Sequence, residues 1–253
     1  YKIRDHHYLG EELSVENVMV KSSNIGTARL AAMVGGTRQK EFLSRFGLLD
    51  LTGIELPEAS RAKPQSPKRW SQLSTATVSY GHGISVSPLH IAVAYSSIVN
   101  GGKRVFPTLI KNSEKNQKPK QIISNETSIK LQNILRSVVK NGTAKNAELD
   151  DYSIGGKTGT ADKVNFEKPG YLKDKVITTF VAAFPMEQPR YVLVVTLDEP
   201  EDWSIDKPMR TAGWTAVPVA SEIIKRIAPV LGVRPNRIIT KNIVHGASTK
   251  VAN

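Results

Sequence analysis

The chain has 253 residues, of which 40% are apolar, enough to bury a substantial core. Its 35 Lys and Arg against 23 Asp and Glu give a net charge of +12, but the basic residues are scattered and not interleaved with aromatic residues. We therefore expect no nucleic-acid partner. Cysteine is absent, which excludes disulfides, thiolate catalysis and Cys-based zinc sites, and no apolar run reaches the ~18 residues of a membrane span.

Helical patterns dominate the first part of the chain. Ser14 is predicted to cap a short helix, and residues 25–34 continue with apolar spacing until Gly35. Thr37 is predicted to cap the next helix, over residues 38–46. These signals indicate short helices in close succession.

Loops and two stronger helices follow. Residues 51–70 contain three prolines and no periodicity, which predicts an ordered surface loop. A nearly all-apolar helix starts at Ser87-Pro88 and stops at Asn100-Gly101, so we expect it to be buried. The polar, lysine-rich stretch 112–121 predicts a mobile loop, and residues 126–142 return to helical spacing.

Strand patterns appear in the last hundred residues. Residues 176–184 and 190–200 are rich in β-branched side chains and predict a β-hairpin, while residues 217–232 predict a terminal helix. Helices that come first and strands that come later favour an α+β fold, with helices packed on a sheet.

The run Lys157-Thr158-Gly159-Thr160 is the first candidate for chemistry. In a strand, alternate side chains share a face, so Thr158 and Thr160 would point the same way. Gly159 would leave room for a ligand against the backbone. This arrangement suits a carboxylate, but Lys-Thr-Gly alone is also what an ordinary edge strand with a solvated lysine would show.

The second candidate is Ser22-Ser23-Asn24, which interrupts a helical pattern. Ser and Asn compete for the backbone inside helices, so such a cluster usually marks a cap between two helices. The same break would expose Ser22 and Asn24, one as a hydroxyl that relays a proton and one as an amide that holds a substrate carbonyl. Taken alone, this motif leaves both interpretations open.

Together the two motifs are far more specific. Ser-x-Asn followed more than a hundred residues later by Lys-Thr-Gly resembles the penicillin-binding proteins and serine β-lactamases. The surrounding stretches "VKSSNIGTARLA", "SYGHGISVSPLHIAVAYSSIVNGG" and "GGKTGTAD" look like the transpeptidase domain of a class B penicillin-binding protein, most like the septal cell-division transpeptidases. The resemblance covers roughly residues 8–235, which exceeds a chance motif match.

The resemblance implies a fold and an organisation. The expected fold is the transpeptidase fold of penicillin-binding proteins and serine β-lactamases, an antiparallel sheet flanked by helices, with its N-terminal part missing from these residues. Residues 1–235 would form the C-terminal portion of that domain, and residues 236–253 an irregular tail.

It also implies an activity. The family cross-links peptidoglycan stem peptides that end in D-Ala-D-Ala, reacts with β-lactam antibiotics and uses no cofactor or metal. The expected location is the periplasmic side of the inner membrane, with the anchor outside this sequence, and the expected partners include cell-division membrane proteins.

The site residues carry over motif by motif. Ser22 would relay the proton to the leaving group, Asn24 would bind the substrate amide, and Lys157 would support the hydroxyl network and attract the substrate carboxylate. Thr158 and Thr160 would hold that carboxylate across Gly159, and the Thr160 N–H would form half of the oxyanion hole. The implied catalytic residues are thus Ser22, Asn24 and Lys157, and the substrate-binding residues Thr158, Gly159 and Thr160.

The family's nucleophile motif, Ser-x-x-Lys, should stand upstream of Ser22, and residues 1–21 contain none. Ser60 and Lys63 have this spacing, but Pro64 pushes Lys63 out of helical conformation. Ser137 and Lys140 have it on a helix, where a basic residue in the last turn is ordinary, and they lie on the wrong side of Ser-x-Asn. We reject both matches.

Three interpretations remain open at this level. The first is a transpeptidase whose nucleophile lies outside these residues. The second is a β-lactamase, although the Glu-x-x-Leu-Asn pattern of one β-lactamase class is absent. The third is an inactive protein that acts only as a binding module. A Ser-x-x-Lys in the preceding coding sequence would separate the first interpretation from the third.

Overall fold

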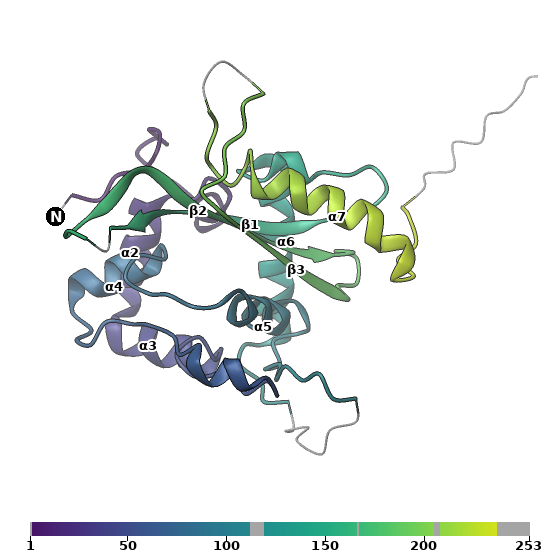
Figure 1. Ribbon diagram of the computed structural model, residues 1–253, viewed down its shortest axis with the longest axis horizontal. Coiled ribbons are helices and arrows are strands. Elements are labelled where there is room, and N and C mark those ends of the chain that lie inside the picture. The colour runs from purple at the N-terminus through teal and green to yellow at the C-terminus, as the bar shows by residue number, and fades with distance from the viewer. Residues whose placement is uncertain (1, 112–118, 166, 205–207, 237–253) are drawn as a thin grey trace, which may run out of the picture.

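A three-stranded antiparallel sheet forms the centre of the protein in the computed structural model, which describes residues 2–111, 119–165, 167–204 and 208–236. The strand order is β1 (Gly155–Val164), β2 (Tyr171–Phe184) and β3 (Tyr191–Asp198). β3 pairs only with the second part of β2, so β1 and the start of β2 continue beyond it as a two-stranded hairpin (Figure 1). The predicted hairpin is confirmed, but β2 begins five residues earlier than predicted.

Helices cover both faces of this sheet, which confirms the α+β class. On one face, Phe180, Ala182 and Phe184 of β2 pack into a core with α7 (Ala216–Val230). On the other face, Ala183 packs with residues of α5 (Pro88–Val99), as the alternation of a strand requires. α6 (Asn125–Asn141) contacts β1 and contributes to both cores.

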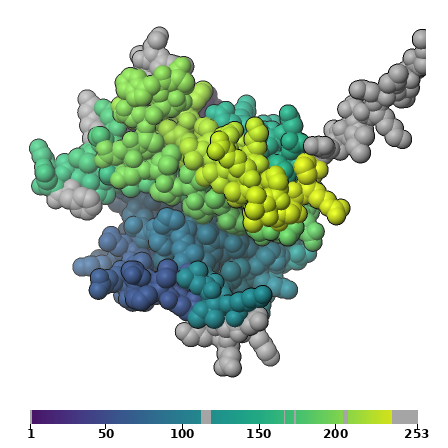
Figure 2. Space-filling view, turned by 45° about the vertical axis from the view of Figure 1, so that its right-hand side comes forward, coloured from purple at the N-terminus to yellow at the C-terminus, as the bar shows by residue number. Residues whose placement is uncertain are grey.

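The remaining helices form a second lobe on the α5 side of the sheet (Figure 1), and its visible part is blue in Figure 2. Its helices are α1 (Val15–Val20), α2 (Asn24–Val34), α3 (Gly36–Arg45) and α4 (Gln72–Ser79), with the short 3₁₀ turn η1 (Pro57–Arg61). The second 3₁₀ turn, η2 (Lys145–Ala147), packs against α6 and α7. α1 bridges the two lobes, because it contacts α2 on one side and α6 on the other.

In the helical lobe, one predicted helix cap is wrong and one helix was not predicted. Thr37 does not cap α3, which starts at Gly36, because Gly35 adopts a φ of 84° and reverses the chain without a side-chain cap. α4 was not predicted, since four of its eight residues are Ser or Thr. The structure stabilises it with a capping box between Ser71 and Ser74.

Two further predictions concern parts of the chain that are not described. Residues 112–118 of the expected loop at 112–121, and residues 237–253 of the expected tail at 236–253, lie outside the described residues. Among the residues that are described, no helix combines the length and apolar character needed to cross a membrane.

Candidate active site

The turn between α1 and α2 places the Ser-x-Asn motif. Ser22 has a φ of 57°, a left-handed conformation that is uncommon for a residue with a side chain. Ser23 is the N-cap of α2, and its hydroxyl accepts a hydrogen bond from the Gly26 N–H at 2.9 Å. The cluster is therefore a cap between two helices, one of the two interpretations left open by the sequence, and the strained Ser22 is held there by the helices on either side.

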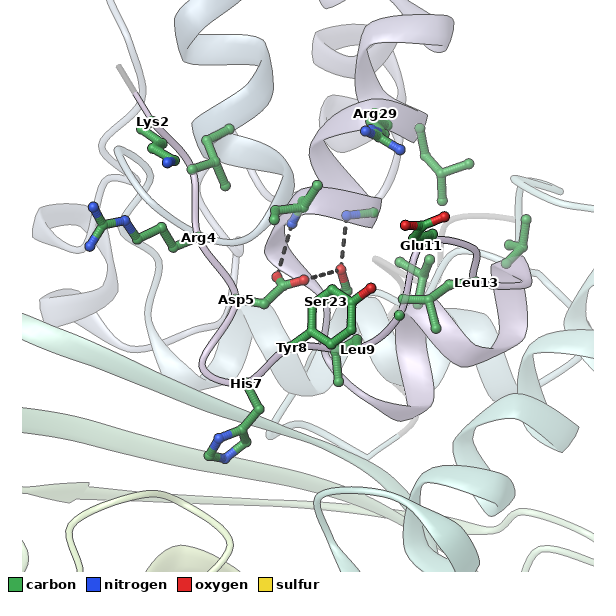
Figure 3. A pocket seen from close by; sticks show the side chains of 17 residues that line it. Lys2, Arg4, Asp5, His7, Tyr8, Leu9, Glu11, Leu13, Ser23 and Arg29 are labelled. Carbon is green, nitrogen blue, oxygen red and sulfur yellow. Dashed lines mark hydrogen bonds between the residues drawn. The ribbon is translucent and has the colours of Figure 1, made fainter.

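The N-terminal segment packs against this turn (Figure 3). The Asp5 carboxylate accepts hydrogen bonds from the Ser23 hydroxyl at 2.8 Å and from the Ile25 N–H at 3.1 Å. A negatively charged side chain at the start of a helix also stabilises it through a favourable interaction with the helix dipole. The side-chain amide of Asn24 donates to the Arg4 carbonyl at 3.2 Å. A hollow of about 720 Å³ lies beside these contacts, lined by residues 2–13 and by parts of α1 and α2.

Lys157 connects the second motif to the first. Its ammonium donates to the Ser22 hydroxyl at 2.8 Å and to the Thr158 carbonyl at 3.0 Å. Burial lowers the pKa of Lys157 to about 8, because a low-dielectric environment disfavours the charged form. Two residues that are 135 positions apart thus meet at one point.

The side-chain hydroxyl of each of the two threonines of β1 has a hydrogen-bond partner. The Thr158 and Thr143 hydroxyl oxygens lie 2.7 Å apart, and the Thr160 hydroxyl accepts from the Ala212 N–H at 3.0 Å. A Cβ added to Gly159 would have no neighbour closer than 3.9 Å. By the alternation of a strand, this open space lies on the Lys157 face of β1, opposite the face of Thr158 and Thr160.

β1 is an edge strand of the sheet, so its outer backbone groups can pair with an extended peptide. The arrangement combines this edge with an ammonium, the Ser22 hydroxyl and the two threonine hydroxyls. Such a site suits an extended peptide that ends in a carboxylate. Asn24 is the first residue of α2, and its side-chain amide donates to the Arg4 carbonyl and not toward Lys157.

Comparison with known families decides which proteins share these features. The sequence model described as "Penicillin binding protein transpeptidase domain" matches residues 1–225. The chain belongs to this family of penicillin-binding protein transpeptidase domains. The fold and the family that the sequence predicted are thereby confirmed.

Curated relatives of this transpeptidase domain agree. The chain is 36% identical over 241 residues to "Probable peptidoglycan D,D-transpeptidase FtsI" of Caulobacter vibrioides, covering 92% of this chain and 40% of the relative. It is 33% identical over 231 residues to "Stage V sporulation protein D" of Bacillus subtilis, covering 87% and 35%. The chain thus spans about two fifths of the length of the relatives it matches.

Solved structures of penicillin-binding proteins share the fold. The transpeptidase domain of Burkholderia pseudomallei penicillin-binding protein 3 superposes with a TM-score of 0.79 at 31% identity, over 93% of this chain and 69% of that one. Penicillin-binding protein 3 of Mycobacterium tuberculosis, solved with ampicillin, gives a TM-score of 0.80 at 28% identity, over 92% and 54%. That protein was also solved with aztreonam.

The two rejected Ser-x-x-Lys matches have other contacts in this transpeptidase fold. Ser60 lies in η1, where its hydroxyl donates to the Pro57 carbonyl at 2.7 Å, and η1 ends before Lys63. The Ser137 hydroxyl donates to Glu16 of α1 at 2.9 Å, and Lys140 is exposed in the last turn of α6.

The sequence also contains a third Ser-x-x-Lys match, Ser204 to Lys207. It follows Lys157 in the chain, on the wrong side of both motifs. The Ser204 hydroxyl donates to Asp202 at 3.0 Å, and Lys207 lies outside the described residues. None of the three matches is recorded in contact with Ser22 or Lys157 within the described ranges.

Proposed function

We propose that this chain forms the substrate-binding side of a peptidoglycan D,D-transpeptidase active site. The observation that carries the proposal is the 2.8 Å hydrogen bond from Lys157 to Ser22, which joins the two family motifs at one point. We propose further that an upstream Ser-x-x-Lys supplies the nucleophile. "The longer protein" below means this chain together with that upstream sequence.

The proposed reaction is acyl transfer through a covalent intermediate. The upstream serine attacks the penultimate D-Ala carbonyl of a stem peptide while the upstream lysine takes its proton, and Ser22 relays that proton to the departing D-Ala amine. Lys157 holds the Ser22 hydroxyl and attracts the terminal carboxylate, which Thr158 and Thr160 bind. Asn24 holds the substrate amide once its side chain leaves the Arg4 carbonyl. An amine from a second stem peptide then takes the acyl group.

Place and partners follow from the same proposal. Nascent peptidoglycan lies outside the cytoplasmic membrane, so the longer protein would be held at the inner membrane with this domain on the periplasmic side. Its ligands would be D-Ala-D-Ala stem peptides and β-lactams, and cell-division membrane proteins would be its partners. Support comes from the family match and from relatives named as D,D-transpeptidases.

The test is donor turnover by the longer protein. Incubated with a D-Ala-D-Ala peptide and an amine acceptor, it should release D-Ala and form the cross-linked product, which mass spectrometry detects. It should also hold a fluorescent penicillin as a stable adduct. Rapid hydrolysis of penicillin instead would favour the β-lactamase interpretation, and failure of both reactions would favour an inactive binding module.

The lowered pKa of Lys157 predicts that the rate of acylation depends on pH. Its side chain is charged below a pH of about 8 and neutral above it, whereas the carboxylate of penicillin stays anionic. The rate of acylation of the longer protein should therefore fall as pH rises through about 8. Stopped-flow measurement of the acylation rate across pH 6–10 checks this.

A matched variant assigns the titration to Lys157. Arg remains protonated throughout this range, so Lys157→Arg should be slower overall but should lack the fall near pH 8. If the same fall persists in Lys157→Arg, another group titrates and the assignment is wrong.

A further inference from the structure

Thr143 lies beside the proposed carboxylate-binding threonines, although no motif points to it. It follows the end of α6, is exposed, and its hydroxyl oxygen is 2.7 Å from that of Thr158. Since Thr158 would contact the substrate carboxylate, Thr143 is one hydrogen bond removed from that contact.

The backbone around Thr143 is tightly held. A Cβ on Gly142 would come within 2.5 Å of the Val20 carbonyl oxygen, at the end of α1. A Cβ on Gly213 would come within 2.8 Å of the Thr143 carbonyl oxygen, and Asn146 donates to the Gly213 carbonyl at 2.9 Å. Three segments therefore fix Thr143: α1, the end of α6, and the turn that precedes α7.

The number of hydrogens on each hydroxyl suggests what Thr143 does. A carboxylate only accepts hydrogen bonds, and a threonine hydroxyl has a single hydrogen to donate. Thr160 already accepts from the Ala212 N–H, so its own hydrogen is free for the carboxylate. The Thr158 hydrogen is free for the carboxylate in the same way only if Thr143 is the donor in the Thr143–Thr158 hydrogen bond.

We propose that Thr143 is a positioning residue that donates its hydroxyl hydrogen to Thr158 and thereby turns the Thr158 hydrogen toward the substrate carboxylate. This inference rests on the proposed function and adds a determinant of specificity for substrates that carry a carboxylate. A hydrogen bond that is already in place before binding lowers the cost of ordering the site. It also polarises the Thr158 hydroxyl.

The test compares two variants in the longer protein. Thr143→Val replaces the hydroxyl with a methyl group and should slow acylation by penicillin by about tenfold, the size of one hydrogen bond. Thr143→Ser keeps the hydroxyl and should restore the rate to within about twofold of the parent. Thr127→Val is the matched control, because Thr127 shares a hydroxyl pair with Ser124 at the opposite end of α6, and it should react like the parent.

A second substrate separates positioning from general damage. Penicillin methyl ester lacks the carboxylate, so Thr143→Val should leave its acylation rate unchanged while the rate with penicillin falls. Equal slowing with both substrates, or no slowing with penicillin, would overturn the proposal while the parent still reacts. If the parent itself fails to react with penicillin, the proposed function is wrong, and the inference falls with it.

Discussion

Lys157→Ala in the longer protein should slow acylation by penicillin by about 10²–10³-fold, the range measured when one preorganised electrostatic donor is removed from an active site. The variant loses two interactions at once. The Ser22 hydroxyl loses the donor that fixes it at 2.8 Å, and the proposed carboxylate site loses its positive charge. The measurement is the second-order rate constant of labelling by a fluorescent penicillin.

Lys163→Ala provides the control on the same strand. Lys163 lies six residues further along β1 and forms ion pairs with Asp198 and Glu199, away from Ser22. Its removal changes the net charge by the same amount, so labelling should stay within about twofold of the parent. Equal losses in both variants would show that overall charge, and not the Lys157 contact, drives the reaction.

Much of the fold could be predicted because its signals are local. Ser14 and Ser87 cap the helices that they were predicted to cap, and Gly35 ends α2. The β-branched runs identified β2 and β3. α4 escaped prediction because Ser and Thr are weak helix formers, and its buried Thr75 and Thr77 are stabilised by the tertiary fold.

Only the site residues that belong to the two motifs could be predicted from the sequence. Ser22 and Lys157 stand in spacings that the family shares, and the structure brings them into contact. The contacts of Thr143 with Thr158 and of Ala212 with Thr160 join residues 15 and 52 positions apart. Such pairs depend on how α6 and the turn before α7 pack against β1, which no local pattern in one sequence reveals.

The 253 residues by themselves should form no stable adduct with a fluorescent penicillin, whereas the longer protein should label. Acylation needs a serine activated by a neighbouring base. The Ser60 and Ser137 hydroxyls donate elsewhere, to Pro57 and Glu16. Circular dichroism of the 253-residue chain, compared with the longer protein, checks that a lack of labelling does not reflect a lack of folding.

Two substitutions in the longer protein sharpen this prediction. Ser60→Ala and Ser137→Ala should label like the parent, because the two hydroxyls donate to Pro57 and Glu16 and not to Ser22 or Lys157. Loss of labelling in either variant, with folding intact, would identify a rejected match as the nucleophile.

The position of the acyl group tests the central claim most directly. After reaction of the longer protein with penicillin, digestion and tandem mass spectrometry locate the modified serine. We expect the modification on the serine of an upstream Ser-x-x-Lys, and its loss from that peptide when this serine is replaced by alanine. A penicilloyl group on any serine within these 253 residues would contradict the account.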